Sequence, residues 1–538
     1  MVLEFVGADR EVTGSCHYVR FNDKHVLVDC GMEQGPDLYV NQEILVPPAD
    51  IDYVFVTHAH IDHSGLLPLL YSHGFRGQIF ATKATCDLCN IMLKDSAHIQ
   101  ESEAEWKNRK AKRAGKAEVV PMYTIEDAVG VLEYFNACDY DSKINICDGL
   151  DVRFVDAGHL LGSASIEMWI TENDETTKIV FSGDIGNGNR PLIKDPTYLE
   201  DADYVLIEST YGDRVHDTPP DYAVLLADII KDTFDRGGNV VIPAFAVGRT
   251  QEILYHMRRI KTEDLLPEYP NFPVYIDSPL AVEATNIFHE NISDCFNYDT
   301  MEMVKSGINP IRFNGLHVAV SSDESKLINM IDTPKVIISA SGMCEAGRIR
   351  HHLKHNLWRE DSTILFVGYQ VPGTLGFNLL NGATSVKLFG EDIDVRAKII
   401  KCPGISAHAD SDHLIAWIKH FKKKPKRVFV VHGEEKTALT FADRINLETG
   451  FVVSVPYSGD VYDLHENACI KEGSKERALT AKNKAQSSGN LRATGVYARL
   501  LQSGNRLMHV IQKCQGMANK DLAKFADQIT ALADKWDR

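Results

Sequence analysis

A six-residue stretch, His-Ala-His-Ile-Asp-His at positions 58–63, constrains the fold of this chain more than any other feature. It directly follows the apolar run Tyr53–Val56, so we predict a strand that ends where the cluster begins. Three imidazoles and one carboxylate at a strand end suit Zn²⁺, and also Mn²⁺ or Fe. The alternative is a polar loop that is merely rich in histidine, because 21 of the 538 residues are His. The sequence therefore favours a metal site at the carboxyl edge of a sheet.

Three more metal-ligand side chains follow apolar runs further along the chain. His159, Asp184 and His432 each come just after a predicted strand, with a glycine nearby that lets the backbone turn sharply. Any one of them alone would more often be a capping or surface residue. Asp29 lies at another strand end, and we expect it to orient the cluster through hydrogen bonds. Together the strand ends supply enough ligands for two metals, namely His58, His60, Asp62, His63, His159, Asp184 and His432.

The composition indicates which class of protein this chain belongs to. Apolar residues make up 44% of the chain, and no apolar run approaches the ~20 residues of a membrane span. Met1–Phe5 contains no basic segment followed by an apolar stretch, and the 11 cysteines are scattered and odd in number. We therefore expect a cytoplasmic protein with reduced thiols and no membrane association. For the CxxC at Cys86 and Cys89, in a predicted helix, packing is favoured over a redox or zinc role.

The rhythm of predicted elements changes along the chain. Up to residue 210, short β-rich runs separated by few residues predict a sheet domain whose early strands are antiparallel. Residues 211–395 alternate longer helices and strands, which is typical of parallel α/β units. Short strands return over 396–465, beginning with Ala397–Lys401. Residues 466–538 are rich in Ala, Lys, Gln and Leu and predict a helical C-terminal extension, to which we assign no chemistry.

The order of the candidate ligands resembles the metallo-β-lactamase superfamily over residues 1–205 and again over 396–465. The segment between them resembles the β-CASP insertion. Three motifs expected in that branch are present, namely Ile207-Glu208-Ser209-Thr210-Tyr211, Gly404-Ile405-Ser406-Ala407-His408-Ala409-Asp410 and Val431-His432-Gly433-Glu434. The chain is similar to prokaryotic β-CASP ribonucleases and to the endonuclease subunit of the eukaryotic pre-mRNA 3′-end cleavage complex. The resemblance implies an α/β fold: a metallo-β-lactamase αββα sandwich with an inserted parallel-sheet α/β β-CASP domain.

The resemblance also implies a role for each candidate residue. The ligands divide into His58, His60 and His159 for one zinc ion, Asp62, His63 and His432 for a second, and Asp184 as a bridge. Two zinc ions per chain are expected, with Mn as an alternative, and their shared hydroxide would attack a phosphodiester phosphorus. His408 would protonate the departing 3′-oxygen, held and kept charged by Glu208. Asp62, Glu208 and His408 are thus the residues assigned to catalysis, although His408 in a turn could also be structural.

Two segments of the inserted region are candidates for contact with substrate phosphates. One leads into a predicted helix start at Gly248–Arg249, and the other leads from Ser341 and Gly342 into a second start near residue 344. Helix N-termini with small residues accept phosphates well. The alternative is ordinary packing between a loop and a helix. Arg249 and Arg348 could grip phosphates, and each could equally be the partner in a structural ion pair.

The predicted substrate is single-stranded RNA. A histidine at the position of His432 resembles the RNA-processing branch of the family, whereas a valine there resembles the DNA-repair branch. The chain lacks the long C-terminal domain usual in the RNase J group, which favours a zinc-dependent endoribonuclease and leaves a 5′-to-3′ exoribonuclease as the alternative. A small-molecule metallohydrolase does not explain Glu208 and His408, and a non-catalytic RNA-binding subunit does not explain a full set of ligands. We also expect that the chain can form a homodimer.

Overall fold

The computed structural model describes residues 1–33, 46–114, 118–371, 373–403 and 406–476, the helix at 519–536, and the single residues 507 and 511. The chain divides into two compact units, Met1–Asp37 with Asn41–Ser474, and Leu38–Val40 with Lys475–Arg538. The described helix of the second unit is α17 (Asn519–Trp536). Most of the predicted C-terminal extension lies outside the described residues. Its beginning is not helical, because Ala468–Lys471 forms strand β23.

Two sheets form the sandwich of the first unit. The eight-stranded sheet has the order β23-β22-β1-β2-β3-β4-β5-β6, and the seven-stranded sheet has the order β21-β20-β11-β10-β9-β8-β7. The first contains β22 (Val461–Asp463), β1 (Val2–Gly7), β2 (Cys16–Phe21), β3 (Lys24–Val28), β4 (Tyr53–Phe55), β5 (Gln78–Thr82) and β6 (Phe135–Cys138). The second contains β21 (Val453–Ser454), β20 (Arg427–Val431), β11 (Tyr204–Glu208), β10 (Glu175–Phe181), β9 (Ala164–Glu172), β8 (Leu150–Asp156) and β7 (Ile144–Cys147).

The prediction that the early strands are antiparallel is wrong after β3. β2 and β3 form an antiparallel pair, but β3, β4, β5 and β6 run parallel to one another. Helices follow β4 and β5 and return the chain to the starting edge, which a parallel connection requires. Parallel strands place their carboxyl ends at one edge, so residues that follow different strands can meet there.

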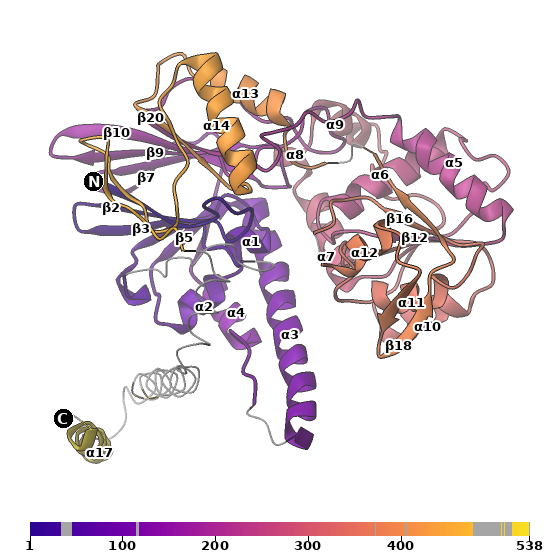
Figure 1. The fold of residues 1–538 in the computed structure, drawn as a ribbon, viewed down its shortest axis with the longest axis horizontal. Helices are drawn as coiled ribbons and strands as arrows, with labels where there is room; N and C mark the ends of the chain where they lie inside the picture. Colours follow the sequence, from indigo (N-terminus) through magenta and orange to yellow (C-terminus); the bar gives the residue numbers. More distant parts are fainter. Residues whose placement is uncertain are drawn as a thin grey trace. The chain divides into compact units, whose positions relative to one another are not determined.

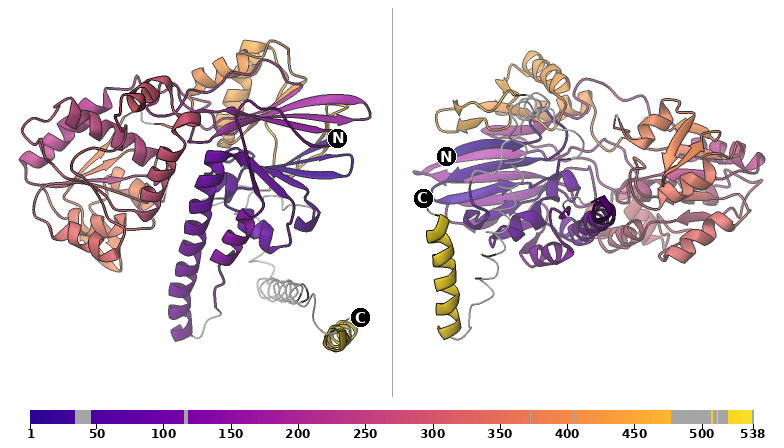
Figure 2. Two further views of the ribbon diagram at one scale, coloured as in Figure 1. Left: turned by 180° about the vertical axis from the view of Figure 1, so that it is seen from behind. Right: turned by 60° about the horizontal axis from the view of Figure 1, so that its bottom comes forward.

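Helices cover both outer faces of the sandwich (Figures 1 and 2), as the αββα prediction requires. The helices on the side of the first sheet are α1 (Ile61–Ser64), α2 (Leu67–Ser72), α3 (Lys83–Ala114) and α4 (Ile125–Leu132). The second sheet is covered by α13 (Ser411–Lys419) and α14 (Glu435–Thr449), whose Trp417 and Phe441 are fully buried against it. Phe55, Phe154 and Phe429 lie buried in the layer between the sheets. Cys89 of the CxxC is buried in the core on α3, in keeping with the packing alternative.

The inserted domain is built on a six-stranded sheet in the order β14-β13-β15-β12-β16-β19, and every pair in it is parallel. Its strands are β12 (Val240–Pro243), β13 (Val274–Ile276), β14 (Leu316–Val318), β15 (Val336–Ser339), β16 (Thr363–Phe366) and β19 (Lys398–Lys401). Val240 and Ile242 face one layer of helices, while Val241 faces the other. The first layer contains α5 (Tyr222–Asp235), α6 (Arg249–Thr262) and α7 (Pro279–Glu290), and the second contains α10 (Ser322–Met330), α11 (Ile349–Asn356) and α12 (Leu375–Leu380).

Four short elements complete this domain: α8 (Ile292–Cys295), α9 (Tyr298–Lys305) and the hairpin of β17 (Ser385–Leu388) and β18 (Glu391–Asp394).

One strand departs from the predicted organisation. β19 pairs with β16 inside the inserted sheet, although its residues were expected to begin the return segment after 395. From β19 the chain passes to α13, β20 and α14, which join the sandwich (orange in Figure 1). None of the described helices is long and apolar enough to cross a membrane.

Candidate metal centre

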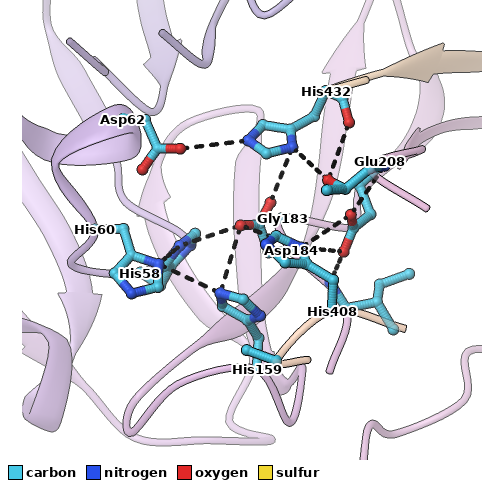
Figure 3. A network of polar contacts seen from close by, with 12 residues as sticks. His58, His60, Asp62, His159, Gly183, Asp184, Glu208, His408 and His432 are labelled. Carbon is cyan, nitrogen blue, oxygen red and sulfur yellow. Dashed lines mark hydrogen bonds and ion pairs between the residues drawn. The ribbon is translucent and has the colours of Figure 1, made fainter. Parts of the chain in front are cut away.

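The strand ends of the sandwich bring the predicted ligands into one cluster (Figure 3). β10 and β11 are parallel neighbours, and so are β11 and β20, with Glu208 in register with Val431. Asp184, Glu208 and His432 therefore emerge side by side at one edge of the second sheet. His58 follows β4 at the matching edge of the first sheet. Three groups of donor atoms result among the described residues: His58, His60, His159 with Asp184; Asp62, His63 with His432; and Asp184 with the Glu208–His408 pair described below.

The first group forms a compact cage of donor atoms. His60 Nδ1 lies 3.0 Å from His58 Nε2 and 3.3 Å from His159 Nε2. Asp184 Oδ2 is 3.5 Å from each of those two Nε2 atoms. Four ligands about 2.0–2.1 Å from a tetrahedral Zn²⁺ would lie about 3.3 Å from one another. These four distances of 3.0–3.5 Å are close to the spacing around a tetrahedral ion.

The second group shares Asp184 with the first. His63 Nε2 lies 3.3 Å from Asp184 Oδ1 and 3.2 Å from His432 Nε2. Asp62 Oδ2 is 3.7 Å from the same atom of His432. The two oxygens of the Asp184 carboxylate thus face different groups. This is the arrangement in which one carboxylate can bridge two cations.

The protonation states favour cations at the centre. Burial lowers the pKa of His58 and His159 well below the usual range and that of His60 to about 4, so these imidazoles are neutral and can act as ligands. Burial would raise the pKa of Asp62, but His432 and the other nearby imidazoles lower it to about 2. Asp184 Oδ1 and His159 Nδ1 are buried, and neither has a hydrogen-bond partner in the part of the chain that the structure describes. Neutral imidazoles facing ionised carboxylates and an unsatisfied buried oxygen fit divalent metal, which requires deprotonated ligands.

His63 shows the same preference for positive charge. Burial opposes its protonation, yet Asp184 and Asp29 outweigh burial and raise the pKa of His63 well above the usual range. Asp29 Oδ2 lies 2.7 Å from His63 Nδ1, and its other oxygen accepts the Thr57 backbone N–H at 2.8 Å. This contact fixes the ring so that Nε2 points into the centre, the orienting role expected of Asp29.

Sequence reasoning missed three hydroxyl groups that support the ligands. Thr57 Oγ1 donates to Asp29 Oδ2 at 2.9 Å, and Thr210 Oγ1 lies 3.0 Å from His432 Nδ1. Ser163 Oγ accepts the backbone N–H of His159 at 3.0 Å. Thr57 immediately precedes His58, and this adjacency could have identified Thr57 from the sequence. Thr210 belongs to the motif that contains Glu208, but its partner His432 is 222 residues away, and Ser163 in its turn had no comparable signal.

Glu208 and His408 form a pair beside the centre. Glu208 is fully buried, and its Oε2 lies 3.1 Å from His408 Nδ1 while its Oε1 accepts the Ile185 N–H at 2.6 Å. Burial would lower the pKa of His408, but Glu208 and Asp184 outweigh it and raise the pKa to about 9. The His408 ring keeps about a fifth of its surface exposed. With Nδ1 held by Glu208, Nε2 is the nitrogen that can give a proton to a substrate. Gly404 and Ile405 of the same motif lie outside the described residues.

The predicted phosphate contacts receive less support. Arg249 is buried and forms an ion pair with Glu252. Arg348 Nη1 lies 2.7 Å from the buried Asp277. These contacts favour the ion-pair alternative for both arginines. The helix start expected near residue 344 is wrong, because α11 begins at Ile349; Ser341 and Gly342 therefore lie in a loop rather than at a helix N-terminus.

Comparison with known proteins gives three family matches in chain order. The metallo-beta-lactamase superfamily matches residues 9–243, the Beta-Casp domain 250–379, and the Zn-dependent metallo-hydrolase RNA specificity domain 392–456. Ribonuclease TTHA0252 of Thermus thermophilus is 35% identical over 459 residues, which cover 84% of this chain and 98% of that protein. The RNase J-like protein of Methanocaldococcus jannaschii is 32% identical, covering 86% and 99%. Transcription termination factor FttA of the same organism is 31% identical, covering 82% and 68%.

Proposed function

The chain belongs to the β-CASP ribonuclease family of the metallo-β-lactamase superfamily, and on this premise we propose that it hydrolyses phosphodiester bonds in single-stranded RNA at two metal ions. The observation that carries the proposal is the pair of donor groups that lie against the two oxygens of Asp184, with the buried Glu208–His408 pair beside them. A small-molecule metallohydrolase needs a metal but not this second pair.

We assign the metal ligands as two sets. The first ion would be held by His58, His60 and His159 and the second by Asp62, His63 and His432, with Asp184 common to both. Nitrogen-rich donor groups at tetrahedral spacing favour zinc, while the carboxylates also suit manganese. Bound divalent ions of this kind supply Lewis-acid activation of water and of the phosphoryl oxygens near neutral pH.

The protein side chains handle the protons of the reaction. Water adds to the phosphorus and the bond from phosphorus to the 3′-oxygen breaks, which leaves a 5′-phosphate and a 3′-oxygen. His408 Nε2 donates its proton to that oxygen, and Glu208 holds the resulting neutral ring in place through Nδ1. Asp62 is the more exposed of the two carboxylates among the ligands, and we assign it as acceptor of the proton lost by water.

RNA is the proposed polymer for two reasons. The chain matches an RNA specificity domain over 392–456, which includes His432, and a relative that is covered over 98% of its length is named a ribonuclease. Thr210 and the backbone of Ser209 both contact His432, so this histidine is held firmly at the edge of the metal centre. Its replacement should therefore alter polymer selection together with metal binding.

We propose endonucleolytic cleavage, and the similarity to an RNase J-like protein keeps 5′-to-3′ exonucleolytic cleavage as a second candidate. A circular single-stranded RNA separates them, because only an endonuclease can open it. We expect the purified protein to linearise the circle, and to do so only while metal is bound. The Asp184→Asn variant is the matched control for a contaminating nuclease.

Three outcomes would contradict parts of the proposal. Degradation of linear 5′-monophosphate RNA to mononucleotides, with the circle intact, would replace the endonuclease with the exonuclease. Equal cleavage of matched single-stranded DNA would remove the RNA preference. Full activity after exhaustive removal of metal, verified by elemental analysis, would refute the metal-dependent mechanism.

A further inference from the structure

The loop that follows Asp184 lies between the metal ligands and the segment that carries His408. The Asn187 N–H donates to the carbonyl of Ala407 at 3.0 Å, and the Ala409 N–H donates to the carbonyl of Ile185 at 2.8 Å. His408 therefore sits opposite Gly186 in a short antiparallel bridge. The position of the His408 backbone depends on this loop.

Arg190, near the end of the same loop, holds two backbone carbonyls. Its Nη1 donates to the carbonyl of His159 at 2.6 Å and lies 3.4 Å from the carbonyl of Ala407. The side chain is 9% exposed, so the guanidinium is largely removed from water. One carbonyl belongs to a proposed metal ligand and the other to the residue before His408. A single planar group thus spans the two sides of the reaction site.

The other end of the Arg190 guanidinium is held by the inserted domain. Its Nε donates to Glu252 Oε1 on α6 at 2.7 Å. Glu252 also pairs with Arg249, and both side chains are buried. Burial would raise the pKa of Glu252, but Arg190 and Arg249 outweigh it and lower the pKa, so the carboxylate is charged. A charged, buried, hydrogen-bonded pair is strong and directional, so it can transmit the position of one domain to the other.

We propose that Arg190 is a positioning residue for general-acid catalysis: anchored by Glu252 of the inserted domain, it sets the His408 segment at the correct distance from the His159 side of the metal centre. This inference rests on the proposed function, because it uses His408 as the proton donor. It assigns to the inserted domain a part in alignment of the catalytic groups. Arg190 itself touches no reacting atom.

The test compares two substrates that differ in their need for an acid. Cleavage of RNA expels an alkoxide, which needs a proton, whereas the p-nitrophenyl ester of a nucleotide 5′-phosphate expels nitrophenolate, which does not. In Arg190→Gln we expect kcat on RNA to fall about 100-fold, within the range of general-acid effects, and kcat on the ester to change less than about threefold. Arg190→Lys should behave similarly, because one ammonium cannot form the planar, forked set of contacts.

Control variants distinguish misplacement of the His408 segment from a general loss of structure. Lys194 also joins this region to the inserted domain, through its Nζ and the Asp294 carbonyl at 2.6 Å, yet its side chain is exposed. Lys194→Gln should leave both rates unchanged. Should Arg190→Gln fail to fold or lose metal, Glu252→Gln serves as the second variant, since it weakens the ion pair between Arg190 and Glu252 while Arg190 remains. It should show the same selective loss on RNA.

A double variant tests whether Arg190 acts through His408. Arg190→Gln should cost about 100-fold in the wild-type background and almost nothing when added to His408→Ala, because residues that act as a unit are not additive. Equal losses on RNA and ester, or full additivity with His408→Ala, with metal content retained, would overturn the inference. Failure of the wild-type protein to cleave RNA while it hydrolyses the ester would instead refute the proposed function, so the two failures are distinguishable.

Discussion

The carboxyl edges of two sheets in this molecule carry buried carboxylates that meet different partners. At the edge of the sandwich, the imidazoles and carboxylates of the proposed ligands face one another at 3.3–3.7 Å, and Asp184 Oδ1 has no hydrogen-bond partner among the described residues. At the edge of the inserted sheet, Asp277 is equally buried, but its oxygens contact Arg348 Nη1 at 2.7 Å and His352 Nε2 at 2.6 Å. Three of the imidazoles at the first edge are kept neutral by burial, whereas a guanidinium already faces the carboxylate at the second edge.

This difference indicates which edge binds an ion. Burial would raise the pKa of Asp277, but hydrogen bonds from His352, Ser325 and Arg348 outweigh it and lower the pKa. That carboxylate is neutralised by its own domain and stabilises the fold. The carboxylates of the sandwich face imidazoles, three of which are kept neutral by burial. Buried acidic residues at strand ends therefore need their partners identified before a function is assigned to them.

The largest effect is expected from Asp184→Asn. The amide keeps the shape of the side chain but loses the charge that both donor groups share, so at least one metal should be lost. Several kcal/mol of lost stabilisation corresponds to a decrease in kcat of about 10³–10⁴-fold or more. Elemental analysis and cleavage of RNA measure the two effects. Asp201→Asn, which removes an exposed carboxylate paired with Lys178, should change neither. Retention of two metals with full activity would contradict the bridging assignment.

A smaller effect is expected from Glu208→Gln, which lies beside the centre but outside both donor groups. Without this carboxylate, His408 loses the partner that holds Nδ1 and favours the charged ring. We expect the rate on RNA to fall about 10²–10⁴-fold with two metals retained. A substrate with a nitrophenolate leaving group should lose far less. If metal content falls in parallel with activity, Glu208 belongs to the metal centre. The separation of the metal ligands from the Glu208–His408 pair would then be wrong.

Asp277→Asn tests the edge that is already neutralised. Removal of this charge leaves Arg348 and His352 without their buried carboxylate, which should cost about 3–5 kcal/mol in the free energy of unfolding. The kcat of the folded fraction should change little, because Asp277 touches none of the proposed ligands. Urea denaturation and steady-state kinetics measure the two quantities. Asp394→Asn, at an exposed ion pair with Arg396, is the matched control and should cost less than about 1 kcal/mol. A selective loss of kcat in Asp277→Asn would mean that this edge takes part in catalysis.

The sequence predicted which side chains would lie together because each follows an apolar strand, and parallel strands end at a common edge. His58, Asp184 and His432 are recognisable one strand at a time, without knowledge of their partners. The roles of Arg190, Arg249 and Arg348 depend on a second residue between 3 and 71 positions away, and the sequence contains no sign of which carboxylate each one meets. Strand order is another such property. Lys398–Lys401 reads as the start of a new segment, although it completes the inserted sheet beside β16.

Lys335 provides the smallest and sharpest test, because it is a buried charge of the inserted sheet without a strong counter-ion. It lies at the amino end of β15, 1% exposed, and its Nζ donates to the carbonyl of Ile331 at 2.5 Å and to Asn239 Oδ1 at 3.3 Å. Burial lowers its pKa from 10.5 to about 8, so the unfolded chain binds the proton more tightly between those values. Stability should consequently rise as the pH increases from 8 to 10.5, by up to about 3 kcal/mol.

The Lys335→Met variant cannot gain this stability. The difference in unfolding free energy between wild type and Lys335→Met should therefore shift in favour of the wild type by about 3 kcal/mol between pH 7 and pH 10.5, as measured by urea denaturation. The exposed Lys326, paired with Asp323, is the control, and Lys326→Met should show almost no such shift. If the difference in unfolding free energy for Lys335→Met does not change with pH, the charge of this lysine is balanced by a counter-charge in the fold, as that of Asp277 is. Both buried charges of the inserted domain, Asp277 and Lys335, would then be balanced by groups of that domain, in contrast to the carboxylates of the metal centre.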